Sequence, residues 1–346
     1  MATATAALTR IRSSSIIDAV GLLLLGFVIL WLVVKFFEDP TRFLNVSIIG
    51  ATNGAIYGLV ALGYTLVYGI LQLINFAHGD LFALSGLVAS TMIISVFSLT
   101  EETAIVLVIL GLLGTLAVTV PVFAVFNATI ERIAYKPLRR APRLAPLITA
   151  VGVAFIIQNI SLALYGVDFE SVPNFIPKTD AFTIGGIAFQ WDNIAVFLIV
   201  IPVLVILTWF VRSTRQGKAM RAVSQDREAS AMMGIDVNRT ISVTFFLAGS
   251  LAAVAGLVYL LQFNIRYDTG FELGLIAFTA AVLGGIGNLT GAVLGAMMIG
   301  MVQALNEGLD GTPGGDWTRS LVFGILIAVL VFRPQGILGE RTPEGA

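Results

Sequence analysis

The chain has 346 residues, of which 57% are hydrophobic and 12% are charged, with a formal net charge of −1. Average soluble domains are about 45–50% apolar and about 25% charged, so the composition excludes a soluble globular protein and predicts a polytopic membrane protein. The charges are distributed by loop and give no sign of a nucleic-acid partner. The chain has no cysteine and one histidine, His78, which excludes disulfides, thiolate metal sites and most histidine metal sites, and we expect no metal and no cofactor.

Apolar stretches of helical length follow one another along the chain. The first, 16–34, is long enough to cross a bilayer, and Lys35 to Glu38 follow it without a signal-peptide cleavage pattern, so we interpret it as an uncleaved spanning helix. The candidate membrane segments lie near 16–34, 46–71, 81–98, 104–130, 146–166, 193–211, 241–261, 275–287, 289–305 and 318–332. The sequence therefore predicts an all-α polytopic membrane protein, with about ten transmembrane segments in one domain, 1–346.

Basic residues gather in alternate loops. With the N-terminus inside the cell, the inner regions 10–12, 132–143, 212–240 and 333–341 hold most of the 20 Lys and Arg residues. Loops rich in Lys and Arg stay in the cytoplasm. We therefore expect both termini and the polar stretch 212–240 on the cytoplasmic side of the membrane.

One predicted segment, 275–287, is too short to cross about 30 Å of hydrocarbon at about 1.5 Å per residue. It ends in Gly284-Gly285-Ile286-Gly287-Asn288, and irregular backbone at membrane depth requires shielding by protein or a polar cavity. The distribution of basic residues favours a pair of short or broken helices that meet at Asn288. The alternative is a re-entrant segment, which would exchange the sides of the C-terminus and of the loop 306–317.

The outer loop 167–192 contains an alternating apolar pattern around two glycines. The pattern consists of Phe182, Ile184, Gly185, Gly186, Ile187 and Phe189. Alternation of this kind around a glycine pair is typical of strands joined by a turn. We expect this loop either to form a short hairpin or to lie along the outer surface.

Glycines recur at every fourth position in two predicted helices, as Gly50, Gly54 and Gly58 and as Gly287, Gly291 and Gly295. This spacing lets helix backbones approach closely in a membrane. One interpretation is helix packing inside this chain. The other is a central path between the two helices, because polar residues that are costly in lipid lie beside both ladders. The candidate path residues are Asn53, Gly54, Tyr57, Asn75, Gln158, Asn159, Gly287 and Asn288, with hydrogen bonding between helices as the alternative for the polar ones.

The 21 acidic residues fall at segment ends or in loops. Ion-coupled carriers usually need a carboxylate inside the membrane, so a secondary transporter is disfavoured, whereas a passive pore is not. The nearest candidates are His78 and Asp80, and we expect His78 to be an interfacial hydrogen-bond donor or part of a helix terminus. Gly217-Lys218-Ala219 lacks the Ser or Thr of a phosphate-binding loop. We predict no enzymatic activity, with any ATP hydrolysis on a separate subunit.

The stretch 212–240 is the longest polar interruption of the apolar sequence. Its residues from Arg221 to Gly234 predict one amphipathic helix that ends at a C-terminal glycine. Glu228 follows Arg221 by two helical turns, so one side of this helix would offer both charges. The segment is either a solvated connector or a docking helix.

Several motifs resemble one family of transport proteins. Glu228-Ala229-Ser230, followed after three residues by Gly234, is similar to the Glu-Ala-Ala-x-x-x-Gly loop of bacterial ABC importer permeases. The stretches 74–80, 221–236 and 279–288 resemble the high-affinity branched-chain amino acid permease family, over about Asn45 to Gly336. Thr244-Phe245-Phe246-Leu247 stands where maltose-type permeases have Ile-x-Leu-Pro, which agrees with the branched-chain and ribose-type branch.

The resemblance implies a permease subunit of an ATP-driven importer that carries branched-chain or other neutral amino acids across the inner membrane by alternating access. It implies a second homologous permease subunit, two ATP-binding subunits, an extracytoplasmic substrate-binding protein and membrane lipid as partners. It also implies that Arg221, Glu228, Ala229 and Gly234, within the loop 212–240, couple the chain to the ATP-binding subunit. The alternatives are a urea or amide ABC permease, and a stand-alone channel or secondary carrier.

Overall fold

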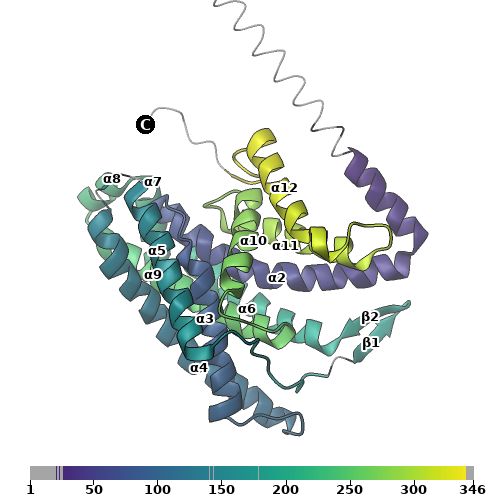
Figure 1. Ribbon diagram of the computed structural model, residues 1–346. Coiled ribbons are helices and arrows are strands. Elements are labelled where there is room, and N and C mark those ends of the chain that lie inside the picture. Colours follow the sequence, from purple (N-terminus) through teal and green to yellow (C-terminus); the bar gives the residue numbers. More distant parts are fainter. Residues whose placement is uncertain are drawn as a thin grey trace, which may run out of the picture.

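The computed structural model describes residues 21, 23, 26–139, 141–142, 144–177 and 179–339, and helices make up most of it (Figure 1). Residues 26–38 are helical. The remainder of the predicted segment 16–34 lies partly outside the described residues.

The helices follow the predicted segments in order. They are α2 (Pro40–Leu71), α3 (Ala77–Thr91), α4 (Ile105–Ile130), α5 (Leu144–Tyr165), α6 (Trp191–Ser213), α7 (Arg215–Gln225), α8 (Arg227–Met232), α9 (Val237–Gln262), α10 (Thr269–Gly284), α11 (Leu289–Gly308) and α12 (Thr318–Phe332). Within the described residues, 8 helices, counted with the short turns that extend them, are long and apolar enough to cross a membrane, and α10 is a shorter apolar helix. This confirms the all-α polytopic membrane fold. The side of the membrane on which each end lies remains a prediction.

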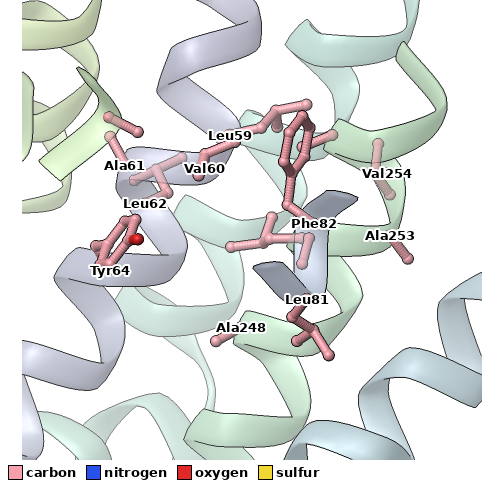
Figure 2. Packing of buried hydrophobic residues seen from close by; sticks show 14 of the residues in the cluster. Leu59, Val60, Ala61, Leu62, Tyr64, Leu81, Phe82, Ala248, Ala253 and Val254 are labelled. Atoms are coloured by element: carbon pink, nitrogen blue, oxygen red, sulfur yellow. The ribbon is translucent and has the colours of Figure 1, made fainter. Parts of the chain in front are cut away.

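Helix α2 lies at the centre of the bundle. In its most apolar stretch 83% of the residues are buried inside the protein, against 22% in each of α4, α5 and α6. Leu59 and Leu62 of α2 belong to one core with Phe82 of α3 and Val254 of α9 (Figure 2). The outer helices expose leucine, isoleucine and valine, which lipid tails solvate as well as protein does.

Helices α2 and α11 approach through their backbones at Gly54. A Cβ atom on Gly54 would lie 2.7 Å from Met297 Cα of α11, and one on Gly300 would overlap the Gly54 backbone. The first glycine ladder therefore packs two helices of this chain together. In the second ladder, Gly295 meets the backbone of α10 at Ala280. Helix α11 is thus in contact with α2 on one side and with α10 on the other.

The predicted pair of helices around Asn288 is present. The 16 residues of α10 reach only about 24 Å at about 1.5 Å per residue. Asn288 caps α11, because its Oδ1 accepts from Gly291 N at 3.0 Å. Residues 333–339 fold back onto this turn, where Leu338 N donates to Gly284 O at 3.0 Å and Asn288 Nδ2 donates to Leu338 O at 2.9 Å. The first bond satisfies a carbonyl that the end of α10 leaves open, and the second holds residues 333–339 against the turn.

The hairpin alternative for the loop 167–192 is confirmed. Strands β1 (Asp180–Ile184) and β2 (Ile187–Gln190) are antiparallel. Their turn is Gly185-Gly186, with φ values of +61° and +86°, which glycine adopts without strain. The hairpin precedes α6 and projects from the bundle at the end away from α7 and α8 (Figure 1).

Candidate functional site

The polar stretch 212–240 forms α7 and α8 at one end of the bundle, between α6 and α9 (Figure 1). Side-chain caps begin the consecutive helices: Thr214 starts α7, Asp226 starts α8 and Asp236 starts α9. Their oxygens accept from backbone N–H groups of the first turn at 3.0, 2.8 and 2.9 Å. Such caps satisfy the free N–H groups of a helix start. The local sequence therefore fixes where each of these helices begins.

The prediction of one continuous helix from Arg221 to Gly234 is wrong. The chain is extended at Asp226, with φ −151° and ψ 116°, so that it separates α7 from α8. Aspartate interrupts a helix because its carboxylate bonds to nearby backbone N–H groups. Arg221 and Glu228 consequently lie on different helices, and they do not form the single charged side that the spacing suggested.

Two arginines tie this pair of helices to membrane-spanning helices. Arg221 Nη1 on α7 donates to the Val211 carbonyl near the end of α6. Arg227 Nη2 on α8 donates to the Ile70 carbonyl near the end of α2 at 2.7 Å. Burial, and to a lesser degree the charge of Arg139, lowers the pKa of Arg227. The bond from Arg227 to Ile70 joins α8 directly to the end of the central helix.

A cleft of about 430 Å³ lies between α8, the end of α2 and the turn after α4. It is lined by Ile70, Leu71, Gln72, Leu73, Tyr135, Arg139, Ala141, Pro146, Val223, Ser224, Gln225, Asp226, Arg227 and Glu228. Tyr135 also donates to Asn75 Oδ1 at 2.7 Å. The predicted path residue Asn75 is thus buried in the turn between α2 and α3, next to a wall of this cleft.

A buried ion pair lies on the same side of the bundle. Glu131 has no exposed side-chain surface, and it pairs with Arg139, whose side chain is 14% exposed. Glu131 also accepts from Ser242 Oγ of α9 at 2.7 Å. Arg139 in turn donates to Asn238 Oδ1 of α9 at 2.6 Å. The sequence did not reveal this network, because Glu131 and Arg139 read as ordinary charges in a cytoplasmic loop.

The end of α8 is exposed and apolar. Gly234 ends it with φ +82°, which confirms the predicted glycine terminus. Met232 and Met233 are 82% and 83% exposed, Glu228 is exposed and Ala229 is half-buried. The methionines were not among the predicted coupling residues; the signal that could have found them is a pair of large apolar residues directly before a helix-ending glycine. Methionine suits adaptable protein contacts because its side chain is flexible.

The predicted path residues are distributed over separate parts of the structure. Asn53, Gly54 and Tyr57 are buried on α2, Gln158 and Asn159 lie on α5, and Gly287 and Asn288 form the α10–α11 turn. Tyr57 Oη donates to Gln303 Oε1 of α11 at 2.5 Å, whereas Asn159 is exposed and donates to Phe155 O of its own helix at 2.8 Å. The role of these residues in a path stays a prediction.

His78 lies in the first turn of α3, in agreement with the expected helix terminus, and it is buried inside the protein. Both His78 and Asp80 are buried, at 0% and 3% exposure. The His78 ring packs edge-on against Tyr64 at 5.0 Å between centroids. The carboxylate and the imidazole therefore lie inside the protein, which the segment boundary near residue 81 did not indicate.

Comparison with known families identifies the chain. Residues 47–330 match the family model described as Branched-chain amino acid transport system / permease component. The chain belongs to this permease family. The match covers every described spanning helix from α2 to α12 at least in part, so the membership rests on the whole bundle and not on one motif.

Two relatives match this permease over nearly their full lengths. BraD of Pseudomonas aeruginosa, a high-affinity branched-chain amino acid transport system permease protein, is 36% identical over 88% of this chain and 98% of its own. LivH of Escherichia coli K12, which carries the same description, is 34% identical over 89% of this chain and 99% of its own. Among solved structures, PsaBC from Streptococcus pneumoniae in complex with Fab has a TM-score of 0.40 and 14% identity, over 89% of this chain and 97% of that one. The two permease relatives, together with the 8 membrane-capable helices within the described residues, identify a multi-pass membrane transport protein.

Proposed function

We propose that this permease is a subunit of an ATP-driven importer that moves branched-chain or other neutral amino acids across the inner membrane by alternating access. The observation that carries the proposal is the position of α8, an exposed short helix that is hydrogen-bonded to the end of the central helix α2. A subunit that binds α8 thereby reaches the core of the bundle. The descriptions of BraD and LivH support a branched-chain amino acid as the cargo.

The proposed assembly has a second homologous permease, two ATP-binding subunits and an extracytoplasmic substrate-binding protein. The chain lacks the Gly-Lys-Ser/Thr sequence of a phosphate-binding loop, so ATP hydrolysis belongs to the ATP-binding subunits. The basic residues of the stretch 212–240 support a cytoplasmic position for α7 and α8 under the positive-inside rule. The ATP-binding subunit then meets Glu228, Ala229 and the exposed methionines before Gly234.

The proposed mechanism links two positions of α8 to two arrangements of the spanning helices. A ligand shifts a conformational equilibrium only when it binds one state better than the other. The ATP-bound partner therefore holds one position of α8. Arg227 transmits this position to α2, and Arg221 of the adjoining α7 transmits it to α6. Helix α2 in turn packs on α11 at Gly54, so a shift of α2 reaches α11 and α10.

The test is uptake of labelled leucine and of labelled urea into vesicles that hold the whole complex, with and without internal ATP. We expect leucine uptake that requires ATP. Urea uptake in place of leucine would keep the importer and replace the cargo. Flux of either solute without ATP would favour the stand-alone channel or secondary carrier and overturn the proposal.

A further inference from the structure

The β1–β2 hairpin carries an apolar face that is exposed on β1 and half-buried on β2. Phe182 pairs with Phe189, and Ile184 pairs with Ile187. Because side chains alternate along a strand, these four residues share one face, and the rings of Phe182 and Phe189 stack with centroids 4.8 Å apart. Phe182 is 49% exposed and Ile184 is 62% exposed. The face is therefore formed by paired side chains and remains open toward the hairpin tip.

Contacts with α2 show at which level of that helix the hairpin lies. Ala188 N donates to Asn45 Oδ1 at 2.8 Å. At the turn, a Cβ atom on Gly186 would lie 3.4 Å from the Thr41 side chain. The hairpin thus runs beside the first turns of α2, and its tip lies level with the start of that helix. The opposite end of α2 is the one that holds α8 through Ile70.

Helix lengths place the hairpin tip outside the lipid. Helix α6 begins at Trp191, directly after β2, and its 23 residues span about 34 Å, slightly more than the roughly 30 Å hydrocarbon core. The headgroup layer adds only about 5–7 Å on each side. The 4 residues of β2 extend about 13 Å at about 3.3 Å per residue. Lipid can therefore cover the base of the hairpin, next to Trp191, but not Ile184 at its tip.

We infer that the face formed by Phe182, Ile184, Ile187 and Phe189 is a docking surface for the extracytoplasmic substrate-binding protein, an inference that rests on the proposed function. An apolar patch that stands in water beyond a membrane marks a protein contact. A second permease packs along the spanning helices inside the bilayer, whereas a protein in the aqueous phase reaches the tip. The outer backbone edge of β1, which has no further strand beside it in this two-stranded sheet, also excludes a deeper position in hydrocarbon.

The absence of cysteine from the chain allows a direct test with single spin labels. Ile184→Cys carries the label on the docking face, and Thr183→Cys, one residue earlier on the same strand, carries it on the opposite face. Both variants are placed in the complete transporter in lipid nanodiscs. Label mobility, and accessibility to oxygen and to a water-soluble nickel chelate, are measured before and after addition of the substrate-binding protein.

We expect the label at 184 to be mobile and accessible to the nickel chelate at first, and to become immobile and protected when the binding protein is added. The label at 183 should change little. Preferential accessibility to oxygen at 184 would show that lipid covers the face, and immobility before the binding protein is added would show that another transporter subunit covers it. Either result, or no change on addition, would overturn the inference.

A second measurement separates this inference from the proposed function. Ile184→Asp should weaken binding of the substrate-binding protein by about tenfold or more, because it puts a charge into an apolar contact, while Thr183→Asp should leave binding within about twofold. If wild-type vesicles show ATP-dependent leucine uptake and Ile184→Asp binds the protein as wild type does, the docking surface is refuted and the importer is retained. If wild-type vesicles show no ATP-dependent uptake, the importer itself is refuted.

Discussion

The guanidinium of Arg227 on α8 donates to the backbone carbonyl of Ile70 near the end of α2 at 2.7 Å. The two residues are 157 positions apart in the sequence. The acceptor is a backbone carbonyl, which a substitution of Ile70 would not remove. The hydrogen bond can therefore be deleted only by substituting Arg227.

Arg227→Ala should separate ATP hydrolysis from transport. Hydrogen bonds to charged groups contribute about 1.5–3 kcal/mol, so we expect the leucine transported per ATP hydrolysed to fall by about tenfold or more in the reconstituted complex. Arg215→Ala, on the exposed start of α7, is the matched control and should keep the wild-type ratio. A wild-type ratio in Arg227→Ala would refute the transmission from α8 to α2.

Glu228→Lys should abolish most uptake without loss of expression, because the exposed carboxylate of α8 is the proposed contact with the ATP-binding subunit. Uptake of labelled leucine and the membrane content of the complex are measured together. Glu102→Lys makes the same charge change in an exposed turn and should leave uptake unchanged. Normal uptake in Glu228→Lys would exclude this residue from coupling.

Asp226→Ala should loosen α8 without unfolding the bundle. The carboxylate accepts from the N–H groups of Glu228 and Ala229 at 2.8 and 2.9 Å, and loss of such a cap costs about 1 kcal/mol. Amide hydrogen exchange in α8 should become faster by about fivefold, whereas Asp226→Asn, which keeps an oxygen acceptor, should change it far less. Equal exchange rates in the two variants would contradict the capping role.

Gly54→Ala should destabilise the protein, and Gly58→Ala should not. A methyl group on Gly54 would lie 2.7 Å from Met297 Cα, whereas one on Gly58 would lie 3.7 Å from Ala296 Cβ. Overpacking costs about 1–3 kcal/mol, while alanine in an open helical position gains up to about 1 kcal/mol over glycine. Thermal unfolding in detergent compares the two variants, and a similar Tm for both would show that α2 and α11 separate easily.

Glu131→Leu should be strongly destabilising, because it leaves Arg139 without its buried partner. Breaking a buried pair from one side typically costs about 3–5 kcal/mol. The double variant Glu131→Leu with Arg139→Met removes both charges and should recover much of the lost thermal stability. The single variant Arg139→Met is measured as well. If the double variant loses as much stability as the two single variants together, Glu131 and Arg139 are not coupled.

The membrane fold was predictable because segment length and apolar content are local properties of the sequence. The break near Asn288 and the Gly185-Gly186 hairpin were predictable for the same reason. The break at Asp226 was not, since the amphipathic pattern continues across it and only the cap geometry separates α7 from α8. Asp226 is compatible with a continuous helix and with a new helix start, and its bonds to Glu228 N and Ala229 N select the new start.

The sequence indicated where the candidate site lies but did not predict the contacts that form it. The polar stretch 212–240 stood out as an interruption, yet its connections to α2 and α6 depend on tertiary contacts that no spacing rule encodes. Glu131 is a similar case. Helical structure continues past Ile130 as a π-helical turn, Glu131–Tyr135, which keeps Glu131 inside the bundle against α9, where a loop would have left it in water.

The bonds between residues 333–339 and the α10–α11 turn have a consequence for biosynthesis. Asn288 receives its partner Leu338 from a position 50 residues later in the chain, and the carbonyls of Leu283 and Gly284 receive theirs from Ile337 and Leu338. When the ribosome has just completed α11, this turn still lacks those bonds. The α10–α11 turn therefore reaches its final hydrogen bonding only after residues 337 and 338 have been synthesised.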